Sequence, residues 1–149
     1  MNSKQLTLTR LLDAPREVVF KAWTEPEQLA RWWGPSGFTN PRCEADVRPG
    51  GRIHIDMTAP DGTVFPMGGV FREVIVPEKL VFTTTAFEDP QGHAGLENLN
   101  TVLFSEEGNQ TRLTLHVEVL HASAAAQGAL SGMEEGWTQS LVRLSAWVG

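Results

Sequence analysis

The stretch from Ser123 to Val148 carries the longest helical period in the chain and constrains the fold more than any other feature. Six apolar residues recur there in steps of three or four, which keeps them on one helix face: Leu130, Met133, Trp137, Leu141, Leu144 and Val148. Ser123 is a suitable N-cap residue, and a helix of this length would reach about 40 Å. The pattern therefore predicts one amphipathic helix that crosses the whole domain.

Three glycines spaced by four lie in the first part of this stretch and form one ridge: Gly128, Gly132 and Gly136. Each costs about 1 kcal/mol relative to alanine inside a helix. One interpretation is that the ridge lets another backbone or a ligand approach closely. The other is that the first half of the stretch is partly loop.

The length of 149 residues fits one domain, residues 1–149. No apolar run is long enough to span a membrane, and the N-terminus has no apolar signal segment, so we expect a cytoplasmic protein without membrane insertion. The net charge of -6 and the lack of Lys/Arg runs argue against nucleic acid as a partner.

The N-terminal part predicts a strand followed by two short helices. Residues 4–12 alternate leucine with threonine, as in a strand with one buried face. After a first short helix, Thr24 and Glu27 have the spacing of a capping box, which predicts a second. Trp32 and Trp33 fall on the buried side of that helix. Because an indole N–H group needs a partner, we expect at least one of them at the rim.

From Thr39 onward apolar residues recur at every second position, and turn residues divide the chain into six further strands. The predicted strands are 39–48, 52–59, 63–76, 79–88, 99–106 and 110–120. Asp61-Gly62 is a hairpin signal, whereas Pro66 and Gly68-Gly69 predict a bulge or bend. Residues 89–95, which include His93, are expected to form a flexible loop.

The order of one strand, two helices, six strands and one helix is typical of an α+β fold. Short turns between the strands favour an antiparallel meander, whose apolar face must be covered. The C-terminal helix is the element long enough to cover it. We therefore expect a seven-stranded antiparallel sheet wrapped around that helix, with a cavity between the two.

Short motifs spread over nearly the whole chain point to a family. They are Ala14 to Thr24, Pro26-Glu27, Trp32 to Pro35, Arg48 to Gly51, Gly69 to Val74, Pro77 to Thr83 and Gly132 to Trp137. In this order they resemble the START-like (Bet v-like, SRPBCC) superfamily, and more narrowly its branch named after the activator of the heat-shock protein ATPase Aha. The resemblance implies a helix-grip fold. Superfamily members include carriers of apolar molecules, polyketide cyclases or dehydratases, and chaperone-binding proteins, so the fold does not select among these functions.

No set of residues has the spacing of a catalytic or metal site. His54, His93, His116 and His121 show no ligand spacing with each other or with carboxylates, so we expect neither a metal ion nor another cofactor. His54 and His116 fall on the outward parity of their strands. Cys43 is interpreted as a small strand residue rather than a nucleophile.

Glu73 is the carboxylate whose position the pattern leaves open. Phe71 and Ile75 share its parity and would draw it inward, but the opposite parity is at least as apolar. Glu73 is therefore either a buried acid or a surface residue paired with a basic side chain, and we assign it no catalytic role.

A set of apolar and aromatic residues is expected to face the interior and to line a ligand pocket. The set comprises Trp32, Ile55, Met57, Phe82, Leu115, Val117, Met133, Gly136, Trp137 and Leu141. For each of them, simple filling of the core is the alternative. The preferred function is binding of a small apolar ligand, lipid-, sterol- or polyketide-like. The alternatives are a chaperone-activator-like interaction domain that binds a protein and, more weakly, a polyketide cyclase- or dehydratase-like enzyme.

Overall fold

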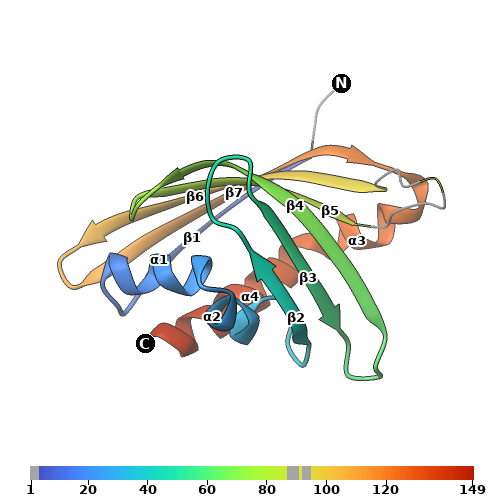
Figure 1. Ribbon diagram of the computed structural model, residues 1–149. Helices are drawn as coiled ribbons and strands as arrows, with labels where there is room; N and C mark the ends of the chain where they lie inside the picture. Colours follow the sequence, from blue (N-terminus) through green and yellow to red (C-terminus); the bar gives the residue numbers. More distant parts are fainter. Residues whose placement is uncertain (1–3, 87–90, 92–94) are drawn as a thin grey trace.

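The computed structural model describes residues 4–86, 91 and 95–149, which form a curved antiparallel sheet with helices on its concave face (Figure 1). The strands are β1 (Gln5–Leu12), β2 (Thr39–Ala45), β3 (Arg52–Thr58), β4 (Val64–Ile75), β5 (Lys79–Ala86), β6 (Leu96–Glu107) and β7 (Gln110–Ala122). They are ordered β1-β7-β6-β5-β4-β3-β2, and every neighbouring pair is antiparallel. The seven-stranded α+β helix-grip prediction is confirmed.

The helices are α1 (Arg16–Thr24), α2 (Pro26–Trp32), the 3-10 turn η1 (Ala124–Ala126), α3 (Gln127–Ser131) and α4 (Met133–Val148). The two short helices lie between the first and second strands, as predicted. No helix among the residues described is long and apolar enough to cross a membrane.

The strand periodicity places apolar side chains on the concave face. In β7, Leu113, Leu115 and Val117 are fully buried, whereas the residues between them are partly exposed. The same alternation buries Ile53 and Ile55 on β3. Because successive strand residues point to opposite faces, this alternation makes one face of the sheet available for covering by helices.

The predicted C-terminal helix is divided near its start. Gly132 has φ -96° and ψ 2°, outside the α-helical region, and separates α3 from α4. Ser123 precedes η1 but makes no side-chain capping bond. The long amphipathic helix therefore begins at Met133. The break at Gly132 agrees with the interpretation of an irregular first half, whereas Gly136 lies within α4.

Two expectations about the second short helix are wrong. Glu25 occupies the N-cap position without a side-chain bond, and Thr24 Oγ1 instead donates to the Phe20 carbonyl at 2.9 Å, so no capping box forms. Trp32 and Trp33 are both buried, at 0% and 6% exposure. Trp32 can be buried because its indole Nε1 donates at 2.9 Å to a carbonyl near the end of α1, that of Ala22.

The bulge in β4 lies further along than predicted. The strand continues through Pro66 and Gly68-Gly69, and its register against β5 shifts between Phe71 and Glu73. Gly69 is needed for close packing rather than for a bend, because a Cβ there would overlap the carbonyl oxygen of Thr83. Most of the loop expected at 89–95, His93 included, lies outside the described residues.

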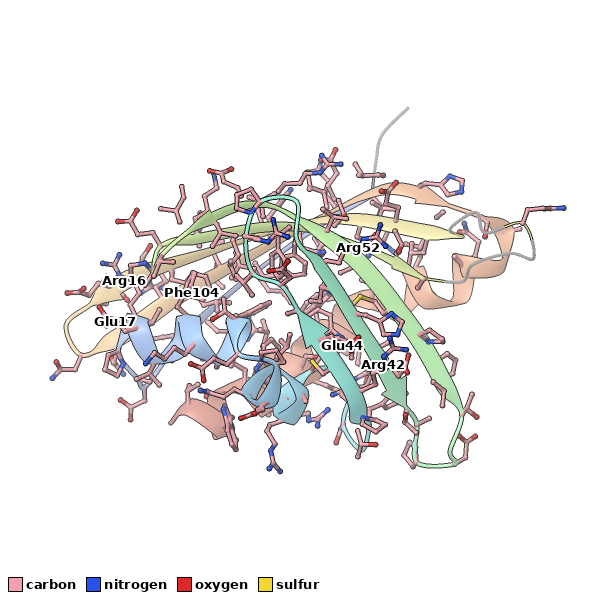
Figure 2. All side chains as sticks on the ribbon, viewed as in Figure 1. Arg16, Glu17, Arg42, Glu44, Arg52 and Phe104 are labelled. Atoms are coloured by element: carbon pink, nitrogen blue, oxygen red, sulfur yellow. The ribbon has the colours of Figure 1, made fainter. Side chains whose placement is uncertain are left out.

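The core lies between the sheet and helices α1, α2 and α4. Trp23 of α1 stands at its centre, with ring centroids 4.6 Å from Trp32, 6.4 Å from Phe82 and 6.3 Å from Phe104. Phe104 extends from β6 towards α1 (Figure 2), where its ring meets Phe20 edge-on at 5.2 Å. This aromatic cluster fills the end of the sheet beneath α1 and α2, which leaves the other end available for a cavity.

Candidate ligand-binding cavity

A cavity of about 680 Å³ lies between the sheet and the start of α4. Its walls come from β3, β4, the end of β5, the start of β6, the segment 33–38 that follows α2, and the first half of α4. Val64 and Phe65 on its wall are 49% and 38% exposed. The cavity therefore communicates with solvent at the β4 side.

The helix wall is made by one face of α4. Four residues of this face line the cavity, and they follow one another in steps of three, one and three: Met133, Gly136, Trp137 and Ser140. A Cβ built at Gly136 would meet no atom within 4 Å, so this position borders open space. Gly136 thus widens the cavity by the volume of the side chain it lacks.

Two tryptophans form an aromatic corner of the cavity. The rings of Trp33 and Trp137 are 5.2 Å apart at 80°, close to perpendicular. Trp137 is also stacked on Trp23, with centroids 6.1 Å apart and planes inclined by 19°. Because the aromatic core braces both rings from behind, they present a flat, preformed apolar surface to the cavity.

The opposite wall contains polar groups from β5 and β6. Thr84 and Asn98 are paired across the two strands, and each is 8% exposed. The side chain of Asn100 donates at 3.1 Å to Thr84 Oγ1 and at 3.2 Å to the Phe82 carbonyl. Asn98 Oδ1 is buried without a hydrogen-bond partner in the described part of the chain. Thr84 and Asn98 therefore form a polar spot in the sheet wall.

Arg143 on α4 holds the rim segment in place. Its guanidinium donates hydrogen bonds of 3.0 to 3.2 Å to the carbonyl oxygens of Arg31, Trp33, Gly34, Pro35 and Phe38. Burial lowers the pKa of Arg143 from its usual value. Gln139 adds a further bond, since its Oε1 accepts from the Ser36 backbone N–H at 3.0 Å. Arg143 and Gln139 thus join the helix wall of the cavity to segment 33–38 at its rim.

The structure separates the ten predicted ligand-binding residues into two groups. Four of them lie in the cavity wall: Met57, Met133, Gly136 and Trp137. Six lie in the core, away from the cavity and each at most 1% exposed: Trp32, Ile55, Phe82, Leu115, Val117 and Leu141. The alternation along a strand and the apolar face of a helix identify which side chains point inward. They do not show which part of the interior is filled by the helices and which part stays open.

Several wall residues were not among those predicted: Trp33, Phe38, Phe65, Met67, Thr84 and Asn98. A signal for two of them existed, because the turn after β3 sets the pairing of Met57 with Phe65 and of Ile55 with Met67. Cross-strand partners share a face, so the inward parity of β3 carries over to β4. The Arg143 contacts had no comparable signal in the sequence.

The remaining candidate groups lie in ordinary structural settings. Lys79 Nζ is 3.2 Å from Glu73 Oε1, which makes Glu73 the surface residue of the two alternatives. His116 Nδ1 lies 2.7 Å from Thr7 Oγ1 on the exposed side of the sheet. On β2, Arg42 and Glu44 form a surface ion pair at 3.1 Å and lie side by side in Figure 2. These residues hold the outer surface of the sheet together.

Cys43 shows no sign of activation as a nucleophile, and His54 pairs with a carboxylate of its own strand. Partial burial, with a smaller effect of the neighbouring Glu44, raises the pKa of the Cys43 thiol to about 11. His54 Nε2 lies 2.8 Å from Asp56 Oδ1 on the same strand. Among the residues described, no group of three or more His, Cys, Asp or Glu side chains could hold a metal ion. That the protein works without metal stays a prediction.

Comparison with known proteins assigns the chain to a family. Residues 13–149 match the family model described as Activator of Hsp90 ATPase homolog 1-like protein. No curated protein matches the sequence. Among solved structures, a protein from Arthrobacter aurescens is 27% identical, with a TM-score of 0.85 over 97% of this chain and 85% of its own.

Two further structures agree with that match. Protein Ms6760 from Mycobacterium smegmatis is 25% identical, with a TM-score of 0.80 over 100% of this chain and 96% of its own. The AHSA1 protein from Silicibacter pomeroyi is 26% identical, with a TM-score of 0.77 over 96% of both chains. This chain therefore belongs to the Activator of Hsp90 ATPase homolog 1-like family, an Aha-type branch of the START-like (SRPBCC) superfamily.

Proposed function

We propose that the protein is a small-molecule binding module that holds an apolar ligand between the sheet and α4. The observation that carries the proposal is the cavity itself. Its volume of about 680 Å³ falls in the range of about 300 to 1,000 Å³ that is usual for small-molecule sites. A lipid-, sterol- or polyketide-like molecule is of the right size and polarity.

The chemistry of the wall suits a pocket of loose specificity. Met57, Met67 and Met133 contribute flexible thioether side chains that adapt to irregular apolar shapes. Trp33 and Trp137 provide the rigid surface against which a ligand packs. Because most of these contacts are apolar and non-directional, we expect modest affinity for a range of ligands.

Binding without covalent chemistry fits the partners of the reactive groups in the wall. Ser140 Oγ donates to the Gly136 carbonyl at 3.0 Å, an ordinary backbone contact within α4. His54 pairs with Asp56 on its own strand. A nucleophile needs a base within hydrogen-bond reach, and Ser140 contacts a carbonyl oxygen instead. These contacts favour a carrier over a cyclase or dehydratase.

The test uses an apolar fluorescent dye with purified protein. Binding should raise the melting temperature as the dye concentration passes its dissociation constant, and it should change the fluorescence of Trp137. Gly136→Leu should abolish both responses, because the new side chain occupies the cavity. Ala146→Leu places the same side chain on the exposed face of α4 and is the matched control.

A response that survives in Gly136→Leu would place the dye elsewhere and contradict the proposal. If a broad apolar library gives no thermal shift at all, the chaperone-activator alternative becomes the better one. That alternative is supported by the description of the family alone. Its partner would be a chaperone or another protein rather than a small molecule.

A further inference from the structure

The polar spot in the cavity wall restricts the kind of ligand that the cavity accepts. Asn98 lies in this wall at 8% exposure, and its Oδ1 has no hydrogen-bond partner among the described residues. A buried acceptor without a donor is unfavourable, and native proteins leave few of them. A ligand that brings a donor to Asn98 would remove this cost. Oδ1 is buried where it stands, and among the described residues no side-chain hydrogen bond holds the Asn98 carboxamide, so a rotation about its terminal torsion can bring Oδ1 to the cavity side.

Thr84 supplies a complementary group beside Asn98. The two residues are paired across β5 and β6, so their side chains project from the same face of the sheet. Thr84 Oγ1 accepts a hydrogen bond from Asn100 Nδ2 at 3.1 Å, which leaves its own hydroxyl proton to donate. Acceptor and donor thus stand next to each other in an otherwise apolar wall.

The charges around the cavity disfavour an anionic ligand. Arg143 contacts the rim, but its guanidinium is already committed to five backbone carbonyls. His54, the titratable side chain among the described wall residues, faces Asp56 at 2.8 Å. A carboxylate placed beside Asn98 would meet no lysine or arginine among the described wall residues, and a buried charge without a compensating cation is strongly unfavourable.

We propose that the ligand is a neutral apolar molecule with a hydroxyl group, anchored by Asn98 and Thr84. The ligand hydroxyl donates to Asn98 Oδ1, and its oxygen accepts from the Thr84 hydroxyl. The apolar remainder lies against Trp33, Trp137 and the methionines. This inference rests on the proposed function, since it assigns the polar end of the ligand in the same cavity.

The test compares decanol, its methyl ether and decanoic acid by calorimetric titration at pH 7. The three share one apolar chain and differ in whether the polar end donates a proton or carries a charge. Decanol should bind about tenfold more tightly than the ether, as expected for one buried hydrogen bond. The ionised acid should bind more weakly than decanol. In Asn98→Leu, the preference for decanol over the ether should disappear while the ether still binds.

Thr84→Val provides a second variant, with Thr101→Val on the opposite face of the sheet as its control. The first should weaken decanol and its ether alike, because the oxygen of either ligand accepts from Thr84, and the second should leave both affinities unchanged. Unchanged affinities in Thr84→Val would contradict the anchoring, so the test stands even if Asn98→Leu fails to fold. Equal affinity of wild-type protein for decanol and ether, or tighter binding of the acid, would overturn the inference while leaving the apolar carrier intact. Failure of all three to bind folded protein would overturn both.

Discussion

Replacing Arg143 with methionine should loosen the rim of the cavity and destabilise the fold. Arg143 is the only side chain described that joins α4 to five carbonyl oxygens between residues 31 and 38. These carbonyls follow the last turn of α2, where backbone acceptors lack helical partners. Methionine preserves much of the apolar stem but removes all five donors.

The magnitude follows from the number and exposure of these bonds. Four of the five are partly buried, and the bond to Arg31 is exposed. At about 1 kcal/mol net for each partly buried bond, the four bonds sum to about 4 kcal/mol. Water reaches some of the freed carbonyls, so we expect a loss of about 2 to 4 kcal/mol. Arg143→Lys should recover less than half, because an ammonium group has three donors and no planar fork.

Urea unfolding followed by tryptophan fluorescence measures this loss as a shift of the midpoint. Arg42→Met is the matched control, because Arg42 is exposed and forms a single surface ion pair with Glu44. That change should cost no more than about 0.5 kcal/mol. If Arg143→Met were no more destabilising than the control, the rim would not depend on this arginine and the reasoning would be refuted.

Three further predictions concern single residues. Trp137→Ala should cost about 3 kcal/mol in urea unfolding, at the lower end for a large aromatic because one side of Trp137 already borders the cavity; a loss typical of a surface residue would show that the ring is not packed. Gly69→Ala should lower the melting temperature by several degrees, since its Cβ overlaps the Thr83 carbonyl, and an unchanged melting temperature would contradict the close approach of β4 to β5. Cys43 should react slowly with iodoacetamide at pH 8, because its thiol, with a pKa of about 11, stays protonated there, and a rate like that of free cysteine would disprove the raised pKa.

The sequence predicted the sheet well because the alternation of apolar and polar residues along a strand has a direct physical cause. Residues such as Leu113, Leu115 and Val117 point to one face whatever the tertiary context, and that face is buried. Likewise, the apolar stripe of α4 from Met133 to Val148 follows from the helical period. Both patterns depend on local backbone geometry and not on how the elements pack together.

Features that depend on packing could not be predicted in the same way. The C-terminal helix is divided at Gly132, whose backbone leaves the α-helical region, whereas propensity alone allowed a continuous helix. Leu115 and Val117 face inward as expected, yet they lie in the filled core and not in the cavity wall. The polar pair of Thr84 and Asn98 depends on strand register, which the sequence pattern did not assign to the cavity.

The most direct test of the central claim is a crystal structure of the protein soaked with bromodecane. The anomalous scattering of bromine gives the position of the ligand directly. The account predicts a bromine peak inside the cavity, between the Trp33 and Trp137 corner and Met57. Peaks confined to the outer surface, with the space beside Gly136 filled by protein side chains, would contradict it.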